Sequence, residues 1–196
     1  MCCILSAGAK LAGLLVLSAY NAKEVTMDLN ELLRDVPDFP KPGIVFKDIT
    51  PILADGKAFR EAVDRTVEGL APDDVDAVVG VEARGFIFAA AASYKLGCGL
   101  LIVRKPGKLP AATVSESYAL EYGTDTLEIH RDAVRPGMRL VLIDDLLATG
   151  GTLAATARLV ERLGGKVVGI RFLIELTFLA GRSKLKGYDV RSIIKV

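Results

Sequence analysis

The feature that most constrains the fold is a regular alternation of short apolar runs with helical stretches from residue 76 to residue 196. An apolar run bounded by charged residues is typical of a strand that is buried on both faces of a sheet. The predicted strands lie at 76–82, 99–105, 139–145, 166–176 and 188–196, and we expect the first four to be buried. Strands that alternate with helices predict an α/β fold with a mostly parallel central sheet flanked by helices.

The stretches between and before these runs have the spacing of helices. Residues 85–97 are almost entirely apolar and end at a glycine, which suits a helix C-cap. Residues 152–164 and 59–70 place apolar side chains on one helical face. Three prolines in PDFPKPG, residues 37–43, exclude a regular helix there and predict an extended or turning path.

Residues 1–26 differ from the rest of the chain, because Ala, Leu and Gly dominate them. Their apolar run at 11–17 is too short for a transmembrane helix, which needs about 20 residues, so we expect no membrane partner. A secretory signal would have a basic start and a cleavage site, and an organelle-targeting extension would be richer in arginine. We favour an upstream translation start or a cloning remnant, with Met27 as the functional start.

A helix signature directly after Met27 supports this division. Asp28 can cap a helix over 29–34, and Glu31 can return the hydrogen bond as in a capping box. We therefore expect a poorly ordered N-terminal extension over 1–26 and one domain over 27–196.

Charge balance and the scarcity of histidine and cysteine exclude several classes of function. The 25 basic and 24 acidic residues nearly cancel to a net charge of +1, so no chain-wide footprint for nucleic acid exists. His130 is the single histidine, which excludes zinc centres built from several histidines and weakens a Ser-His-Asp triad. We expect His130 on the exposed side of a strand. Three cysteines, two of them adjacent, form no disulfide framework and favour a cytoplasmic location.

The segment VLIDDLLATGGT, residues 141–152, predicts a phosphate site. A buried strand leads through a turn of small residues into a helix N-terminus, where backbone amides without intrahelical partners attract anions. Glycine lets the backbone curl closely around the anion. No lysine follows the glycines as in a P-loop, and the dinucleotide spacing is missing. The candidate phosphate ligands are Ala148, Thr149, Gly150, Gly151 and Thr152.

Two carboxylates, Asp144 and Asp145, stand directly ahead of this phosphate loop. They would repel a phosphate unless they bind another part of the same ligand. The hydroxyls of a ribose donate hydrogen bonds to carboxylates. The segment therefore predicts a sugar-phosphate site, against the alternative of a strand end followed by an ordinary N-capped helix.

VLIDDLLATGGT resembles the motif with which type I phosphoribosyltransferases bind phosphoribosyl diphosphate (PRPP). Further segments resemble the adenine-specific members of that family: PGIVFKDITPIL at 42–53, VEARGF at 81–86, IVRKPGKLP at 102–110 and SYALEYGTDTLEIH at 117–130. The resemblance runs from about residue 27 to the C-terminus. It implies the type I phosphoribosyltransferase fold with a small hood and a flexible loop. It also implies transfer of the 5-phosphoribosyl group from PRPP to adenine, giving AMP and pyrophosphate in purine salvage.

The resemblance places the adenine site around Phe46. Phe46 is expected to stack on the purine while backbone groups of Val45 and Lys47 read its edge. A flat apolar face suits a flat base, and backbone groups can distinguish an exocyclic amine from a carbonyl.

The resemblance also implies a pyrophosphate site. Arg84 is expected to contact the pyrophosphate, and the peptide bond between Glu82 and Ala83 is expected to be cis. A departing pyrophosphate carries several negative charges that cations must balance. The expected cations form a cluster after the second strand, at Arg104, Lys105 and Lys108.

The remaining expectations concern catalysis and assembly. The resemblance makes Glu121 the catalytic carboxylate, has Tyr122 contact PRPP, and implies a homodimer. Mg²⁺ prefers phosphate oxygens and keeps several waters, so we expect it to be held mainly through PRPP, without a protein-only metal cage. Glu116 in the loop VSESY has no assigned role.

Two alternatives stay open from the sequence. The acceptor could be another purine or a pyrimidine. The chain could also be a PRPP-sensing regulator that keeps the fold without turnover. The intact SYALEYG segment, residues 117–123, argues against the regulator, because a pure binder needs no hood acid.

Overall fold

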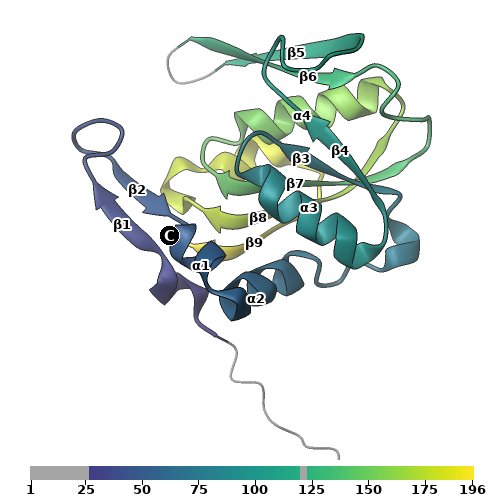
Figure 1. Ribbon diagram of the computed structural model, residues 1–196. Coiled ribbons are helices and arrows are strands. Elements are labelled where there is room, and N and C mark those ends of the chain that lie inside the picture. The colour runs from purple at the N-terminus through teal and green to yellow at the C-terminus, as the bar shows by residue number, and fades with distance from the viewer. Residues whose placement is uncertain (1–26, 120–122) are drawn as a thin grey trace, which may run out of the picture.

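Within the described residues, 27–119 and 123–196, five strands form a central sheet in which every neighbouring pair is parallel (Figure 1). In spatial order they are β4 (Gly99–Val103), β3 (Ala77–Val81), β7 (Arg139–Leu147), β8 (Lys166–Glu175) and β9 (Val190–Lys195). The computed structural model thus confirms the predicted parallel α/β sheet. The predictions about residues 1–26 lie outside the described residues.

Helices cover both faces of the sheet (Figure 1). Successive side chains of a strand point to opposite faces. Val78 of β3 accordingly packs in the cluster that contains Phe88, and Val79 packs in the cluster that contains Leu159. The α-helices are α1 (Thr50–Ala54), α2 (Gly56–Thr66) and α3 (Gly85–Leu96), which share one cluster, and α4 (Gly151–Arg162), which belongs to the other. Short 3-10 helices are η1 (Leu29–Leu32), η2 (Pro72–Asp74), η3 (Thr177–Leu179) and η4 (Gly181–Leu185).

The strand predicted at 99–105 is shorter than expected and is not fully buried. β4 ends at Val103, and its side chains Leu100 and Ile102 are 39% and 37% exposed. The reason is its place at the edge of the sheet, where one side has no neighbouring strand. By contrast, all residues of β3 are buried, because β3 lies between β4 and β7.

The N-terminal helix is also shorter than predicted. Asp28 caps it by accepting a hydrogen bond of 2.9 Å from the Asn30 amide, but the helix is a 3-10 turn that ends at Leu32. Arg34 instead begins β1 (Arg34–Pro37), which pairs antiparallel with β2 (Val45–Asp48). Pairing with a strand removes the end of the predicted helix. The proline-rich segment forms the turn between these strands and contains a cis bond between Phe39 and Pro40.

A second hairpin, β5 (Thr113–Ala119) and β6 (Thr124–His130), packs beside α4 and stands at one edge of the molecule (Figure 1). We call it the hood hairpin, after the hood expected from the sequence. A backbone bridge between Arg104 and Glu128 joins it to the chain that follows β4. No helix among the described residues is long and apolar enough to cross a membrane.

Candidate active site

A cleft opens beside the carboxyl ends of β3 and β7, where a parallel sheet is expected to bind its ligand. Its volume is about 360 Å³. Residues predicted from separate segments of the sequence line it: Arg84, Lys105, Asp144, Asp145, Ala148 and Thr152. Glu82, which the sequence analysis named only for its peptide bond, lines it as well, together with Tyr118 and Leu127, for which no role was predicted. The fold therefore brings six of the residues predicted to bind PRPP to one cavity, whose lining does not include Arg104, Lys108, Thr149, Gly150 or Gly151.

The phosphate loop joins β7 to α4. Gly150 is the N-cap of α4 and has a φ of 76°, in the left-handed region that favours glycine. A Cβ at Gly150 would lie 2.3 Å from the carbonyl oxygen of Gly181. Glycine is therefore required here by the protein's own backbone, and the amides of the first turn of α4 stay open to an anion.

Gly181, at the start of η4, is a structural partner of the phosphate loop that sequence reasoning missed. A Cβ at Gly181 would lie 2.2 Å from the carbonyl oxygen of Ala148. Gly181 lies 33 residues away from Ala148 in the chain, and nothing local in the sequence indicates the contact. Two glycines from separate segments thus let two backbones touch and define the shape of the loop.

The two acids at the end of β7 have different surroundings. Asp145 is buried and forms an ion pair with Arg84. Asp144 accepts a hydrogen bond of 2.9 Å from the Asp145 amide, and a Cβ at Gly85 would lie 2.7 Å from its Oδ1. Burial, followed by the charge of Asp145, raises the pKa of Asp144 well above its usual value. A ligand that donates hydrogen bonds to Asp144 and Asp145 lowers the free-energy cost of holding two acids side by side in a buried place.

Arg84 links the predicted pyrophosphate and adenine sites. Its guanidinium carbon lies 5.1 Å from the centroid of the Phe46 ring, and Phe39 packs edge-on against the same ring at 5.2 Å. The hairpin of β1 and β2 thus brings Phe46 to the residues of the cleft. Val45 is 52% exposed, and Lys47 donates a hydrogen bond of 2.7 Å to Asp35 across the hairpin.

The predicted basic cluster is gathered, and acids hold it in place. Arg104 Nε and Lys108 Nζ each lie 2.9 Å from the Glu82 carboxylate, and Lys105 pairs with Asp125. Burial raises the pKa of Glu82, but the hydrogen bonds from Lys108 and Arg104 outweigh burial and hold it below its usual value. Glu82 is therefore the charged partner of both Arg104 and Lys108.

The structure also tests the predictions about the Glu82–Ala83 peptide bond and about His130. The peptide bond between Glu82 and Ala83 is cis, as the resemblance implied. His130 lies at the end of β6 on the face opposite to the buried Leu127 and Ile129, as expected; it is half-buried there and accepts a hydrogen bond of 3.4 Å from the Ala111 amide. Glu121, which the resemblance makes the catalytic carboxylate, and its neighbour Tyr122 lie outside the described residues.

Glu116, which had no assigned role, fastens the hood hairpin to α4. Its carboxylate accepts hydrogen bonds from Arg158 at 2.6 Å and from Arg162 at 3.1 Å. Arg162 also donates to the Ser115 carbonyl at 2.5 Å. Glu116 therefore holds the hairpin that carries Tyr118 against the helix that starts at the phosphate loop.

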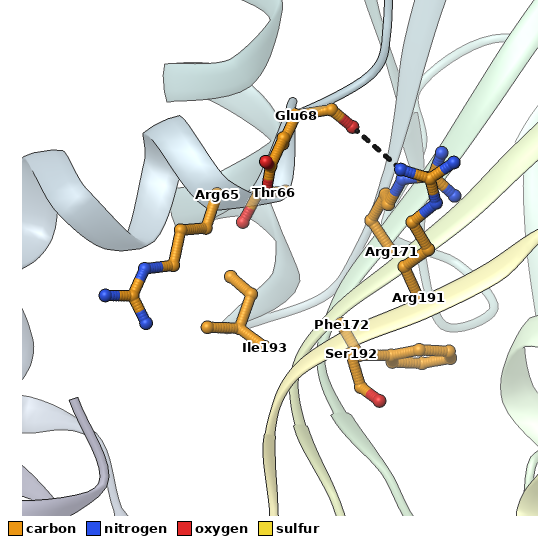
Figure 2. Close-up of a pocket in the computed structure, with 8 residues that line it drawn as sticks. All are labelled: Arg65, Thr66, Glu68, Arg171, Phe172, Arg191, Ser192 and Ile193. Carbon is orange, nitrogen blue, oxygen red and sulfur yellow. Dashed lines mark hydrogen bonds between the residues drawn. The ribbon is translucent and has the colours of Figure 1, made fainter. Parts of the chain in front are cut away.

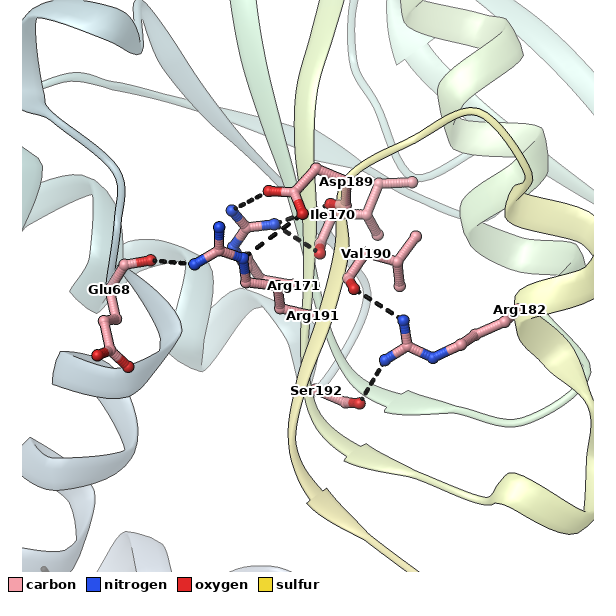
Figure 3. A network of polar contacts seen from close by, with 8 residues as sticks. All are labelled: Glu68, Ile170, Arg171, Arg182, Asp189, Val190, Arg191 and Ser192. Atoms are coloured by element: carbon pink, nitrogen blue, oxygen red, sulfur yellow. Dashed lines mark hydrogen bonds and ion pairs between the residues drawn. The ribbon is translucent and has the colours of Figure 1, made fainter.

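A second pocket, of about 220 Å³, lies between α2 and the strands β8 and β9 (Figure 2). We call it the arginine pocket, after Arg65, Arg171 and Arg191, which line it. Figure 2 shows the guanidinium of Arg65 turned away from the other two. Arg171 pairs with Asp189 at 2.8 Å, and Arg191 donates to the Glu68 carbonyl at 3.4 Å (Figure 3). Arg171 and Arg191 thus join β8, the start of β9 and the turn after α2.

Arg182 belongs to the same network of polar contacts (Figure 3). It makes two hydrogen bonds of 2.7 Å to the Glu175 carboxylate and further bonds to the Val190 carbonyl and the Ser192 hydroxyl. Since Arg182 directly follows Gly181, this fork fixes the backbone against which Gly150 packs.

Comparisons with known proteins agree with this geometry. Residues 46–194 match the family model of the phosphoribosyl transferase domain. The adenine phosphoribosyltransferase of Desulfitobacterium hafniense (strain Y51) is 58% identical over 169 residues, which cover 86% of this chain and 98% of the relative. The crystal structure of adenine phosphoribosyltransferase from Thermoanaerobacter pseudethanolicus is 56% identical with a TM-score of 0.81, and the match covers 86% of this chain and all of that one. The Saccharomyces cerevisiae enzyme, solved in complex with adenine and an imino-altritol bisphosphate, is 36% identical with a TM-score of 0.77 and coverages of 84% and 96%.

Proposed function

Because the chain belongs to the phosphoribosyl transferase family, and to the adenine phosphoribosyltransferases within it, we propose how its residues carry out their reaction. The enzyme transfers the 5-phosphoribosyl group of PRPP to adenine in purine salvage, giving AMP and pyrophosphate. One observation carries the proposed site. A single cleft is lined by Ala148 and Thr152 of the phosphate loop, by two carboxylates and by an arginine, which suit the phosphate, hydroxyl and pyrophosphate groups of one substrate.

The 5-phosphate of PRPP binds the loop from Ala148 to Thr152. Backbone amides of the first helical turn and the positive end of the α4 dipole stabilise the dianion. Gly150 and Gly151 keep side chains out of the loop, and the hydroxyls of Thr149 and Thr152 donate to phosphate oxygens. The packing of Gly150 on Gly181 supports this role, because it fixes the loop before the substrate arrives.

The ribose hydroxyls donate to Asp144 and Asp145. The ribosyl C1 gains positive charge as the bond to pyrophosphate breaks, and two nearby carboxylates stabilise that charge. Hydroxyl donors also replace water around Asp144, whose pKa is raised by burial and by Asp145. Stabilisation of the positive charge lowers the free energy of the transition state, and the hydrogen bonds to Asp144 favour the occupied cleft over the empty one.

The pyrophosphate binds Arg84 and the basic cluster of Arg104, Lys105 and Lys108. Each of these cations pairs with an acid in the described structure, so each is already held near the cleft. Side chains of Arg84, Arg104 and Lys105 are 43%, 32% and 36% exposed, which leaves donors accessible to a ligand. A pyrophosphate with several charges competes well against a single carboxylate.

Adenine stacks on Phe46, and backbone groups of Val45 and Lys47 read its edge. The proximity of Arg84 to the Phe46 ring supports this assignment, because it places the ring beside the pyrophosphate site. Arg84 turns from the ring to the pyrophosphate when PRPP binds, which opens the ring for the base.

Glu121 stabilises a proton at N7 of adenine while N9 attacks the ribosyl carbon, and Tyr122 contacts PRPP. Both roles come from the family resemblance of SYALEYG. Adenine loses one proton when it bonds to the ribosyl carbon, so a carboxylate that holds the N7 proton in the transition state and then takes it acts as a general base. Glu121→Ala is expected to lower kcat by about 100-fold or more while the Kd for PRPP changes little. Equal losses in kcat and in PRPP affinity would contradict this role.

Magnesium is part of the proposal, held mainly by the phosphate oxygens of PRPP. Among residues 27–119 and 123–196, no group of three or more His, Cys, Asp or Glu side chains is arranged to hold a metal ion. The cleft instead offers the two carboxylates of Asp144 and Asp145, which fits a hard cation that keeps its waters. When bound, Mg²⁺ would neutralise charge on the departing pyrophosphate.

We also propose a homodimer that uses the outer side of α3 and the edge strand β4. Ile87 and Tyr94 lie seven residues apart on α3 and are 39% and 91% exposed. Leu101 and Val103 pack with the α4 cluster, so Leu100 and Ile102 point to the face that carries α3. An apolar edge strand of this kind needs a cover. A sedimentation mass of one chain at micromolar concentration would contradict the dimer.

The location and the domain boundary are also proposals. A chain without a disulfide framework suits the cytoplasm. The catalytic domain begins at Met27, whose carbonyl accepts a hydrogen bond of 2.7 Å from Arg65 and is thus fastened to α2. Residues 1–26 are proposed as a dispensable extension, and a chain that starts at Met27 is expected to keep full activity.

A pyrophosphate-release assay with PRPP tests the function directly. Adenine, hypoxanthine, guanine and orotate are offered in parallel as acceptors. Turnover with adenine alone is the expected result. Turnover only with a 6-oxopurine or with orotate would sink the adenine assignment. Binding of PRPP without turnover for any base would favour the regulator that the sequence left open.

A further inference from the structure

A chain of polar contacts crosses the cleft from the pyrophosphate side to the phosphate loop. Lys105 pairs with the carboxylate of Asp125 on the hood hairpin. Asp125 accepts a hydrogen bond of 3.2 Å from the hydroxyl of Tyr118, on the opposite strand of the hairpin. The Tyr118 hydroxyl in turn accepts a hydrogen bond of 3.3 Å from Thr152 Oγ1. Three of these four residues line the cleft, so this series of contacts connects the two phosphate subsites proposed for the cleft.

The hydroxyl of Thr152 has a single proton to donate. In the described structure that proton is directed to Tyr118. A phosphate in the loop needs the same proton, so the 5-phosphate and the Tyr118 hydroxyl compete for one donor. The presence of Tyr118 therefore weakens the binding of the 5-phosphate and eases its departure.

At the Lys105 end of this series of polar contacts, Tyr118 favours ligand binding. Lys105 must leave Asp125 before it can bind a pyrophosphate. Asp125 is 26% exposed, so a lost partner leaves a partly desolvated carboxylate, which costs free energy unless another donor remains. The Tyr118 hydroxyl is such a donor, and the ring below it is buried, with 7% exposure. Tyr118 therefore lowers the cost of releasing Lys105.

We propose that Tyr118 is a positioning residue that links the two phosphate subsites. Its hydroxyl competes with the 5-phosphate for Thr152, and it stabilises Asp125 when Lys105 moves to the pyrophosphate. PRPP carries both phosphate groups, so its binding breaks the contact at Thr152 and the contact at Lys105 together. This inference rests on the proposed placement of the two ends of PRPP in the cleft.

Tyr118→Phe tests the link, because it removes the hydroxyl and keeps the buried ring. Isothermal titration measures the Kd of ribose 5-phosphate and, separately, the Kd of pyrophosphate with Mg²⁺. Ribose 5-phosphate is expected to bind about 2- to 10-fold more tightly in the variant, and pyrophosphate at least about 2- to 10-fold more weakly, as the loss of one hydrogen bond at each end allows. A merely structural loosening of the hairpin would weaken both ligands.

Two further variants keep the test decisive. Tyr188→Phe is the matched control, because its hydroxyl donates to Glu161 on α4 and does not line the cleft; both affinities should stay unchanged. Asp125→Asn removes the charge that holds Lys105 and keeps an acceptor for Tyr118. It should tighten pyrophosphate binding and leave ribose 5-phosphate unaffected.

The outcomes separate this inference from the proposed site. Opposite shifts of the two affinities in Tyr118→Phe support the link. Shifts of the same sign, no shift in either, or an Asp125→Asn variant that binds pyrophosphate more weakly would overturn it. If the unmodified protein binds neither ligand, the proposed PRPP site itself is wrong and the link falls with it.

Discussion

The cleft and the arginine pocket use the same chemistry for different ends. In the cleft, Arg84 pairs with Asp145 and keeps 43% of its side chain exposed. In the arginine pocket, Arg171 pairs with Asp189 and keeps only 2% exposed, and burial lowers the pKa of its guanidinium although Asp189 opposes this shift. Arg171 also donates to the carbonyls of Ile170 and Asp189, which fixes β8 against β9 (Figure 3).

This difference teaches how to tell a binding cation from a structural one. An accessible guanidinium can exchange its carboxylate for a ligand anion at little cost, because water replaces lost contacts. A buried guanidinium that is fixed by backbone carbonyls cannot turn to a ligand without leaving those groups unpaired. Loss of Arg84 should therefore damage activity, and loss of Arg171 should damage stability.

The largest effect is expected from Arg84→Met. Removal of one charged donor at the site of charge development should lower kcat/KM about 100- to 1,000-fold, as for other electrostatic stabilisers. The melting temperature should fall less than in Arg171→Met, because the Arg84 side chain is 43% exposed, although the buried Asp145 loses its partner. Steady-state kinetics and thermal unfolding measure the two quantities. Arg60→Met, at an exposed position on α2, is the matched control and should change neither. A stable variant with unchanged kcat/KM would remove Arg84 from the site.

Gly181→Ala should have the next largest effect. The new Cβ would lie 2.2 Å from the Ala148 carbonyl oxygen and must displace the phosphate loop. A shift of about 1 Å in a binding group can cost up to about 100-fold, so we expect kcat/KM for PRPP to fall about 10- to 100-fold, mainly through KM. Gly56→Ala is the control, because nothing lies within 4 Å of its added Cβ. Unchanged kinetics in Gly181→Ala would mean that the loop is not held as the structure shows.

Arg171→Met should lower the stability of the protein more than its activity, the opposite of the result expected for Arg84→Met. The loss of a buried partner should lower the free energy of unfolding by about 2 kcal/mol, which corresponds to roughly 4 to 8 °C in melting temperature. The activity of the folded variant should remain near normal. Arg191→Met is the control, because Arg191 is 54% exposed on the same carboxylate and should contribute less than about 1 kcal/mol. Equal destabilisation by both variants would contradict the distinction drawn from burial.

The smallest effect concerns Asp76, at the start of the sheet. Hydrogen bonds from the Arg139 side chain and amide lower the pKa of Asp76 from 3.8 to about 2. A carboxyl whose pKa is depressed on folding stabilises the protein above its unfolded pKa, and this contribution disappears as the pH falls through the folded pKa. The free energy of unfolding, measured by denaturant titration, should thus be lower for Asp76→Asn than for the unmodified protein at neutral pH. The difference between the two proteins should shrink between pH 4 and pH 2. A difference that is independent of pH would assign the effect to packing.

Much of this architecture was readable in the sequence because strands and helices have distinct periodicities. The run at 76–82 became β3, and residues 85–97 became α3 with Gly97 as a left-handed C-cap. The run at 99–105 was correctly identified as a strand but wrongly expected to be buried, since its edge position depends on the order of strands. The helix predicted over 29–34 lost its end to β1 for the same kind of reason.

In the candidate site, too, the sequence predicts only what neighbouring residues determine. Asp144, Asp145 and the loop from Ala148 to Thr152 could be identified because one segment contains strand, acids and glycines in order. Tyr118 and Glu82 could not, because a tyrosine in a hairpin and a glutamate after a strand are common. Only their contacts with Thr152, and with Arg104 and Lys108, give them a role.

The sequence by itself determined which elements form and what chemistry the chain carries, because apolar spacing and the local order of acids and glycines are properties of neighbouring residues. Tertiary structure decided which charges remain available to a substrate and which join strands. That choice depends on burial and on partners far away in the chain, such as Gly181 behind Gly150 or Asp125 beside Lys105. The nearly balanced charge of +1 hides this division, since the same residue types serve the cleft and the arginine pocket.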